Sequence, residues 1–534
     1  MLPPFDLIIR NGTLLDGTGA PARRADVGIS GDTIAAIGDL AHASAARVLD
    51  ATACYVTPGF IDIHTHSDET IFLNPQMESK IHQGVTTEVT GNCGSSAAPV
   101  YGAARDDLLR EMARYPDLVF DWYTLDEYLT RVEHTRLSTN YATCVGHGTL
   151  RACVMGHAMR APTDDELKQM QQLLARALEE GAWGLSTGLI YPPSSYADSD
   201  ELVALSRVAA EYGGLYTSHI RNEGDRLLEA VEEALTIGER ARIRVQLAHH
   251  KAAGKRNWGK VNASLEKIAQ ARERGVLVCA DQYPYIASST GLGVVLPDWA
   301  HEGGWDKLSE RLRDAATHQQ IADAVRAARP GWENPAVDSG WHNILIVGCA
   351  SDRSLQGKTV WQIAEMWGKD PVETSLDLLL ANQGAVQIVI FSMCEEDVKT
   401  VLRVPWVFVG SDSSARAPTG PLAESQCHPR AYGTFPRVLA KYVRDENVLT
   451  WEQAIAKMTS GPARMLGLAR RGELRVGYFA DVVVFDPQTI ADTATFTAPH
   501  QFPRGIEYVL VNGVVTIERG AHTGARAGRV LRKP

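Results

Sequence analysis

The sequence lacks an excess of basic residues. Its 534 residues include 53 Lys and Arg against 64 Asp and Glu, which gives a formal net charge of -11 at pH 7. A nucleic-acid partner would require cationic side chains to neutralise phosphates, so this balance argues against one. The negative charge favours solubility but does not identify a substrate.

Long apolar runs and dense cysteine clusters are also missing. No uninterrupted apolar stretch reaches the roughly 18 residues of a membrane-spanning helix, so we expect no membrane partner. The first residues, MLPPFDLIIRNG, lack the basic and apolar regions of a signal peptide, and we expect none. The 8 cysteines are scattered, which predicts reduced thiols and a cytoplasmic location.

Both ends of the chain alternate short apolar segments with turn residues. Residues 7–9 are followed by Asn11-Gly12, and residues 508–511 are followed by Asn512-Gly513. This spacing is typical of β-hairpins. Because a chain of this length needs more than one core, we predict a small β-sandwich domain formed by both termini, residues 1–57 and 475–534.

The middle of the chain alternates short apolar strands with helical segments. A helix is expected after Thr163, an N-cap residue with Glu166 three positions on. The strand candidates are residues 60–64, 86–90, 141–145, 183–187, 215–219, 245–249, 276–281 and 407–411. Eight strands with crossovers predict an α/β fold, a (β/α)8 TIM-like barrel over residues 58–474.

One region does not fit the eightfold alternation. Two more strand candidates, residues 344–347 and 388–391, lie between the seventh and eighth barrel strands. They follow a stretch rich in Trp and Gly that mixes helical and irregular segments. We interpret residues 288–343 as an insertion at the barrel mouth.

The segment GFIDIHTH, residues 59–66, carries the clearest chemical signal. Residues two apart on a strand point to the same face, so His64 and His66 can direct both imidazoles at one metal ion. The alternative is a chance pair of core or surface histidines. Pro58-Gly59 at the strand start, and further candidate ligands at other strand ends, favour the metal.

Those further candidates are Cys93, His219 and His249, each at the end of a predicted strand. Barrel enzymes place their active sites at this edge, and imidazoles with a thiolate form a zinc-type ligand set. Taken singly, Cys93 would more often be a buried structural thiol, and His219 alone decides nothing. His249 and the adjacent His250 point to opposite faces, so only one of them can be a ligand.

Asp412 ends the last predicted strand, within VGSDSS. It could simply cap the following turn. In the functional interpretation, its carboxylate accepts a proton from a water at the metal and later delivers it to a leaving amine. A metal lowers the pKa of such a water to roughly 7 and polarises a carbonyl. These parts predict metal-assisted hydrolysis of an amide-like bond.

The chain resembles the D-aminoacylase (N-acyl-D-amino-acid deacylase) family of the amidohydrolase superfamily over nearly its whole length. The HxH pattern marks only the superfamily, whereas GNCG, HHK and HPRxxGTFPR are much more specific. The matching segments are PGFIDIHTHSD (58–68), GVTTEVTGNCG (84–94), GLIYPPSSYA (188–197), SHIRNEG (218–224), AHHKAAGK (248–255), GSDSS (410–414) and HPRAYGTFPRVL (428–439).

The resemblance implies zinc-dependent hydrolysis of N-acyl-D-amino acids to a carboxylate and a free D-amino acid, with the D preference resting on the resemblance alone. Cys93, His219 and His249 would hold a tightly bound Zn²⁺. His64 and His66 would form a second, weaker position, which Cys93 could also touch, and Asp412 would be the catalytic base.

The resemblance also bears on the group that bridges two metals. Many amidohydrolases use a carboxylated lysine there, but the fourth strand, GLSTG at residues 184–188, offers no lysine. The thiolate of Cys93 would take that role, which is reasonable because a soft thiolate binds zinc well.

An N-acyl amino acid carries a free carboxylate, which requires cations. Lys251 lies two residues after His249 and therefore faces the same side; Arg430 depends mostly on the family match. Either could instead be an ordinary exposed charge. Tyr191 could donate a hydrogen bond to the developing oxyanion, as a catalytic residue, or could pack in its Pro-stiffened loop.

Tyr283 and Ser289 are further candidates for the carboxylate pocket, with Tyr285 and Ser288 as close alternatives in the same segment. Two other functions stay open. Another amidohydrolase reaction, such as cyclic amide opening or acyl-dipeptide hydrolysis, would keep the metal and the base. A non-catalytic barrel scaffold is the other, although the full set of polar groups argues against it. The expected partner is a small-molecule N-acyl amino acid, and no feature indicates an oligomeric state.

Overall fold

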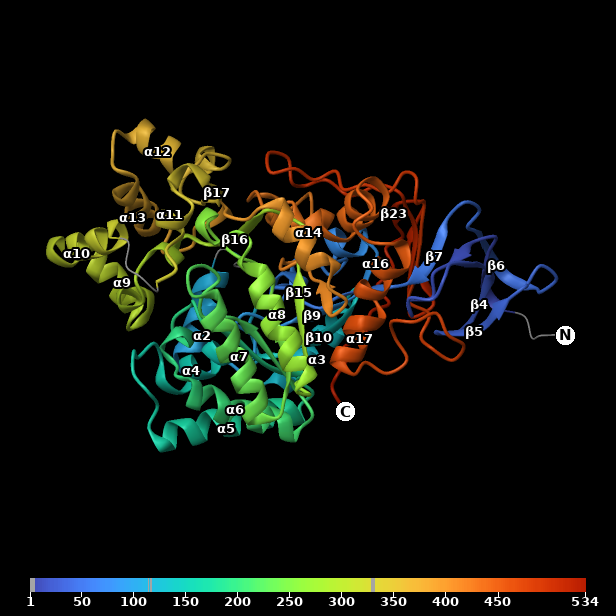
Figure 1. Cartoon of the computed structure of the whole chain (residues 1–534), viewed down its shortest axis with the longest axis horizontal. Coiled ribbons are helices and arrows are strands. Elements are labelled where there is room, and N and C mark those ends of the chain that lie inside the picture. The colour runs from blue at the N-terminus through green and yellow to red at the C-terminus, as the bar shows by residue number, and fades with distance from the viewer. Residues whose placement is uncertain (1–4, 114, 116–117, 328–331) are drawn as a thin grey trace.

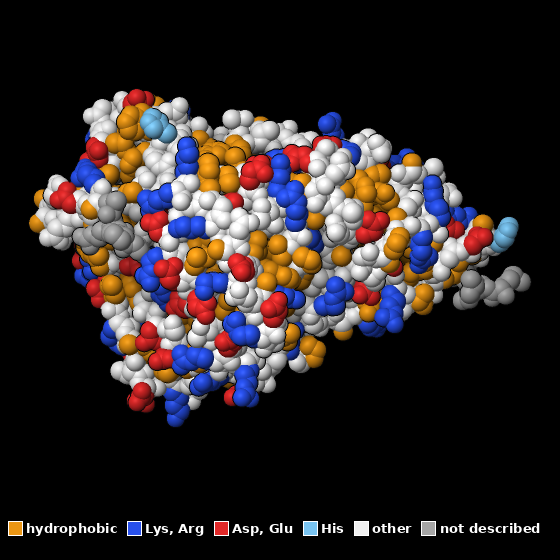
Figure 2. All heavy atoms as spheres, viewed as in Figure 1, with side chains coloured by type: hydrophobic (Ala, Val, Ile, Leu, Met, Phe, Trp, Pro, Cys, Tyr) orange, Lys and Arg blue, Asp and Glu red, His pale blue; other side chains and the backbone are white. Residues whose placement is uncertain are grey.

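A computed structural model describes residues 5–113, 115, 118–327 and 332–534. The fold has three parts along its long axis: a central barrel, a β-sandwich at one end and a smaller helical unit at the other (Figure 1). Charged side chains of both signs are interspersed over the face shown in Figure 2. Among the described residues, no helix combines the length and the hydrophobicity needed to cross a membrane.

The central part is the predicted (β/α)8 barrel. All of its strand pairings are parallel, and the third strand is split in two at Cys144. In order around the barrel, the strands are β8 (Phe60–Asp62), β9 (Val85–Thr90), β10 (Asn140–Thr143) with β11 (Val145–Gly146), β12 (Gly184–Gly188), β13 (Leu215–His219), β14 (Arg244–Leu247), β15 (Val278–Gln282) and β19 (Val407–Val409).

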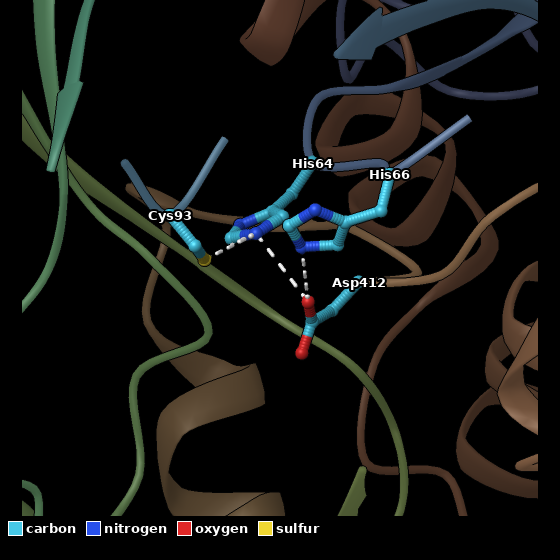
Figure 3. A group of neighbouring side chains, drawn as sticks. All are labelled: His64, His66, Cys93 and Asp412. Atoms are coloured by element: carbon cyan, nitrogen blue, oxygen red, sulfur yellow. Dashed lines mark hydrogen bonds and ion pairs between the residues drawn. The ribbon is translucent and has the colours of Figure 1, made fainter. Parts of the chain in front are cut away.

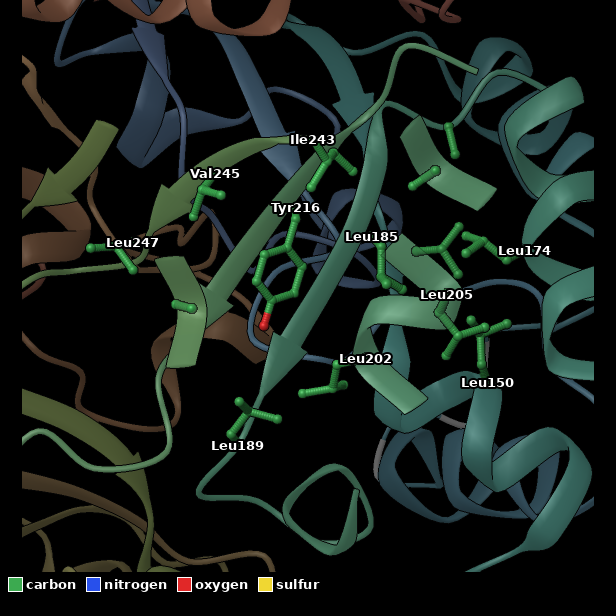
Figure 4. Close-up of a cluster of buried hydrophobic side chains, with 14 of the residues drawn as sticks. Leu150, Leu174, Leu185, Leu189, Leu202, Leu205, Tyr216, Ile243, Val245 and Leu247 are labelled. Atoms are coloured by element: carbon green, nitrogen blue, oxygen red, sulfur yellow. The ribbon is translucent and has the colours of Figure 1, made fainter. Parts of the chain in front are cut away.

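Helices cover the outside of this barrel. The predicted N-cap is present: Thr163 and Glu166 form a capping box that starts α5. Figure 4 shows how Leu185 and Tyr216 of the strands pack among leucines of the surrounding helices. The helices are α1 (Glu78–Ile81), α2 (Gly102–Met112), α3 (Leu125–Thr135), α4 (His147–Met155), α5 (Asp164–Glu179), α6 (Ser199–Glu211), α7 (Leu227–Ala241), α8 (Lys260–Glu273), α14 (Glu395–Arg403), α15 (Arg430–Arg437), α16 (Trp451–Met458) and α17 (Ser460–Leu466).

The β-sandwich combines both ends of the chain, as the sequence predicts. A four-stranded sheet, in the order β5-β4-β1-β6, packs on a seven-stranded sheet in which β20 pairs with β7. The first sheet contains β1 (Phe5–Arg10), β4 (Asp26–Ser30), β5 (Thr33–Gly38) and β6 (Ala45–Asp50). The second contains β2 (Thr13–Leu14), β3 (Arg23–Arg24), β7 (Tyr55–Pro58), β20 (Val482–Phe485), β21 (Ile506–Val511), β22 (Val514–Glu518) and β23 (Ala521–His522).

The region between β15 and β19 has its own sheet and its own hydrophobic cluster. The sheet is antiparallel, in the order β16 (Ala287–Gly291), β18 (Gln387–Phe391) and β17 (Ile344–Gly348). Because the cluster extends from Leu292 to Ile390, we propose that the insertion runs to Phe391 and not to residue 343. Its helices are α9 (Gly304–Arg313), α10 (Ala315–Arg326), α11 (Pro335–Asp338), α12 (Val360–Trp367) and α13 (Pro371–Ala381).

The first and last barrel strands, β8 and β19, are joined by a buried lysine. The Nζ of Lys80 lies 2.9 Å from Asp62 Oδ2 and donates to Ser411 Oγ at 2.6 Å and to the carbonyl of Ser413 at 2.8 Å. The backbone N–H of Ser411 donates to Asp62 Oδ1 at 2.8 Å. One ammonium group therefore holds the seam of the barrel directly beside Asp412.

This arrangement predicts that Lys80→Met strongly destabilises the protein. The substitution leaves the fully buried carboxylate of Asp62 without its cation, a change that costs about 3–5 kcal/mol. Urea unfolding followed by fluorescence would measure the change in the free energy of the first transition. Lys307→Met, which breaks an exposed ion pair with Glu310, is the matched control and should change little. Equal stability of the two variants would contradict the prediction.

Candidate metal centre and active site

The candidate site residues meet at the carboxyl ends of the barrel strands. The metal-ligand and base candidates lie at or just after the ends of β8, β9, β13, β14 and β19, so His64 and Asp412, which are 348 positions apart in the chain, become neighbours. His64 is fully buried behind one cavity of about 490 Å³. That cavity is lined by all the other candidates: His66, Cys93, Tyr191, His219, His249, Lys251, Tyr283, Ser289, Asp412 and Arg430.

Two groups of metal-ligating atoms share the sulfur of Cys93. The first contains His64, His66, Cys93 and Asp412, and these side chains point toward one another in Figure 3. The second contains Cys93, His219 and His249. The Sγ of Cys93 lies 3.3 Å from His64 Nε2 and 3.5 Å from His249 Nε2. The thiol is therefore placed to bridge the two groups, as the resemblance implies.

The backbone turns sharply at three of these residues. Cys93, His249 and Asp412 have φ angles of 52°, 34° and 49°, in the left-handed region that residues other than glycine rarely adopt. Such conformations cost of order 1–3 kcal/mol each and tend to occur at functional sites. The turn after Cys93 also requires Gly94, because a Cβ there would lie 2.6 Å from the backbone nitrogen of Gly188.

The electrostatic surroundings favour a thiolate at Cys93. Burial alone would raise the pKa of this thiol, but the nearby imidazoles of His64 and His249 hold it well below its usual range. A thiolate is the form of cysteine that binds metals.

The surroundings of His219 also indicate a metal site. Its side chain is buried, and neither ring nitrogen makes a hydrogen bond of ordinary geometry within the described residues. Buried polar groups are rarely left unsatisfied in native proteins. With Cys93 and His249 beside it, His219 completes a set of one sulfur and two imidazole nitrogens, which fits zinc with an open coordination position.

Two carboxylates hold the far side of these histidines, and our sequence analysis did not single them out. Asp281 Oδ1 lies 3.1 Å from His64 Nδ1, and Glu223 Oε1 lies 3.0 Å from His249 Nδ1. Such partners fix the tautomer and the orientation of metal-binding imidazoles. Two signals were available: Asp281 ends a predicted strand, and Glu223 lies four residues after His219 within SHIRNEG.

Asp412 lies between the histidines and a cation. Its Oδ1 is 3.0 Å from His66 Nε2 and 3.5 Å from His64 Nε2, and its Oδ2 is 2.8 Å from Arg430 Nη1. Burial would raise the pKa of this carboxyl group, but the Arg430 guanidinium and then His249 hold it well below its usual range. Asp412 is therefore ionised and able to accept a proton.

The substrate-binding candidates surround Tyr283. Arg430 lies 4.6 Å and Lys251 5.6 Å from the centre of its ring. The ammonium group of Lys251 is also 2.5 Å from Glu223 Oε1, so this lysine already has an ionic partner. Ser289 donates its hydroxyl to the carbonyl of Ile388 at 2.8 Å and accepts from Arg430 through its own carbonyl at 3.2 Å.

Tyr191 connects the barrel to the insertion. Its hydroxyl is 3.0 Å from Thr290 Oγ1 on β16, and its ring lies 5.0 Å from that of His219. The two alternatives named for the carboxylate pocket differ in position: Ser288 lines the cavity, whereas Tyr285 is buried against His428 outside its lining.

The fold and the metal-ligand cluster at the carboxyl ends of the strands are those of a metal-dependent barrel hydrolase. The sequence signature of the amidohydrolase family matches residues 47–517, and the chain belongs to that family. It is 41% identical to an N-acyl-D-glutamate deacylase and 39% identical to a D-aminoacylase, both from Alcaligenes xylosoxydans xylosoxydans. These alignments cover 100% and 99% of this chain and 98% of each relative.

Comparison with solved structures points to the same family. The N-acyl-D-glutamate deacylase of Bordetella bronchiseptica, crystallised with zinc and a phosphonate that mimics the tetrahedral intermediate, is 38% identical, with a TM-score of 0.82. The match covers 99% of this chain and 100% of that one. A D-aminoacylase described as having a binuclear metal centre matches with the same identity, coverage and TM-score. A D-hydantoinase, at 16% identity and a TM-score of 0.55, shares the fold.

This geometry predicts that Cys93→Ala weakens metal binding more than about 100-fold, because both ligand groups lose their shared sulfur. Losing a residue that only hydrogen-bonds to a ligand typically weakens metal binding about 10–100-fold. Metal content after dialysis, measured by mass spectrometry, would test this. Cys427→Ala is a matched control, since that buried thiol lines the same cavity but lies outside both ligand groups. If Cys93→Ala retained as much metal as Cys427→Ala, the thiol would have a structural role only.

Proposed function

We propose that this enzyme hydrolyses the amide bond of N-acyl-D-amino acids, releasing a carboxylate and a free D-amino acid, with zinc as its metal. The observation that carries the proposal is the ionised carboxylate of Asp412, which faces the histidines on one side and Arg430 on the other within a single cavity. Relatives that are 38–41% identical over nearly the full chain are named for deacylation of such substrates, which supports the choice.

Zinc, when bound, supplies a Lewis acid that polarises the amide carbonyl and makes water a nucleophile at neutral pH. The residues of the chain do the remaining work. Asp412 accepts the proton of the attacking water and delivers it to the leaving amine. Because its pKa is held low, the carboxylate is in the accepting form at the start of the reaction.

Arg430 and Lys251 supply the positive charge for the substrate carboxylate. In the ligand-free arrangement each is paired with an anion of the protein, Arg430 with Asp412 and Lys251 with Glu223. Both pairs are buried, so the two cations are held in place at the wall of the cavity. The guanidinium fork of Arg430 suits bidentate contact with a carboxylate.

Tyr191 is placed to donate to the developing oxyanion. Its ring contacts that of His219, and its hydroxyl is held by Thr290 of the insertion. Burial keeps the pKa of this phenol well above its usual range, so it remains a hydrogen-bond donor. All 8 cysteines are free thiols, which supports the expected cytoplasmic location.

A substrate panel tests the proposal. N-acetyl-D- and N-acetyl-L-amino acids with acidic, neutral and aromatic side chains should be compared, together with a cyclic amide and an acyl-dipeptide. We expect hydrolysis of the D series only, lost after chelation and restored by zinc. Preferred turnover of the cyclic amide or the acyl-dipeptide would replace the proposal with another reaction of the family.

Asp412→Asn should retain zinc but lower kcat by about 10²–10⁴, because the amide cannot accept and return the proton. Steady-state kinetics on the best D substrate, with metal content measured in parallel, would show this. Asp352→Asn, which changes an exposed carboxylate outside the lining of the cavity, serves as the control. Normal turnover by Asp412→Asn would show that another group is the base.

A further inference from the structure

Asp281, near the end of β15, makes four contacts through one fully buried carboxylate. Its Oδ1 lies 3.1 Å from His64 Nδ1 and accepts the backbone N–H of His249 at 2.8 Å. Its Oδ2 accepts the side-chain amide of Gln246 at 2.6 Å and lies 3.2 Å from His64 Nδ1. Both oxygens of this carboxylate are therefore engaged.

These contacts reach both groups of metal-ligating atoms. His64 belongs to the group with His66 and Asp412, whereas His249 belongs to the group with His219. Asp281 holds the side chain of the first histidine and the backbone of the second. The carboxylate of Glu223, by comparison, has its ionic contacts among the described residues on the His249 side: His249 itself, His219 and Lys251.

At His64, the carboxylate determines which ring nitrogen is free. When Nδ1 donates its proton to Asp281, Nε2 is the ring nitrogen that faces Cys93 Sγ at 3.3 Å and Asp412 Oδ1 at 3.5 Å, and it becomes available to a metal once it gives up its own proton. This is the arrangement that a metal-binding imidazole requires. Without this acceptor at Nδ1, the opposite tautomer would direct a proton at the metal position.

At His249, the same oxygen holds a strained backbone. The φ angle of 34° is in the left-handed region, and the N–H of this residue donates to the carboxylate. Hydrogen bonds to an ionised acceptor are stronger than those between neutral groups. The chain directly after β19 packs against these residues, because a Cβ at Gly410 would lie 2.9 Å from His64 Cβ and 3.2 Å from Asp281 Oδ1.

We propose that Asp281 is a positioning residue that couples the two metal positions. Because one carboxylate holds a ligand of each, the affinity of both positions depends on it, and a shift at one position is passed to the other. The inference rests on the proposed function only for the identity of the metal, since zinc binding is measured without substrate.

The test uses the full-length protein and zinc itself. Apo-protein is titrated with Zn²⁺ by calorimetry, and Co²⁺ absorption reports the thiolate contact of Cys93. In Asp281→Asn, which preserves the shape of the side chain, we expect the affinities of both positions to fall about 10–100-fold. Repeating the titration in a His66→Asn background isolates the Cys93–His219–His249 position.

Glu223→Gln is the matched control. It should weaken only the Cys93–His219–His249 position, because Glu223 has no contact with His64. Loss of affinity at a single position in Asp281→Asn, or unchanged affinities at both, would overturn the proposal. If Asp281→Asn does not fold, the same zinc titration of Gln246→Leu tests the proposal instead. Removing the amide that orients the carboxylate should weaken both positions to a smaller extent, and no effect would likewise overturn it.

Failure of the proposed function would look different. A protein with normal zinc binding, and with both positions sensitive to Asp281→Asn, but without hydrolysis of any N-acyl-D-amino acid, would contradict the substrate assignment alone. Conversely, an active deacylase whose two positions respond independently would contradict only the coupling.

Discussion

The seam between β8 and β19 is the constraint on which the site depends. The seven other pairs of neighbouring barrel strands form parallel ladders. Strands β8 and β19 instead meet through an isolated bridge between Thr65 and Ser413 and a hydrogen bond from the Asp412 backbone N–H to the carbonyl of His64. The Lys80 ammonium group adds the contacts that hold this seam. The distance between Asp412 and the two histidines of HTH is therefore set by the closure of the barrel.

The barrel and the ligand cluster could be predicted because strand periodicity is local. Alternation of apolar segments located all eight strands, and the polar residue at each strand end identified His64, Cys93, His219, His249 and Asp412. The supporting carboxylates were missed because their role depends on contacts between strands. Asp281 looks like any strand residue until its neighbours His64 and Gln246 are known. The end of the insertion is harder to place from the sequence, because the sheet within it pairs segments about 100 residues apart.

The insertion shapes the site through a few contacts from its sheet. Strand β16 places Thr290 against Tyr191 and presents the carbonyl of Ser289 to Arg430. One strand of the insertion thus positions both the candidate oxyanion donor and the candidate carboxylate ligand. Changes within the insertion can therefore alter substrate preference while leaving Cys93, His219 and His249 undisturbed, since those residues are carried by barrel strands and the turns that follow them.

The charges of the site argue for a divalent cation independently of any relative. Among the described groups in direct contact with the two sets of metal-ligating side chains, the thiolate of Cys93 and the carboxylates of Asp412, Glu223 and Asp281 lie against two cations, Lys251 and Arg430. With neutral histidines, this leaves two negative charges uncompensated. The pKa values of His64 and His66 respond accordingly: burial would lower them, but the nearby anions raise the value for His66 to about 9. A metal that binds here must therefore displace protons from these histidines.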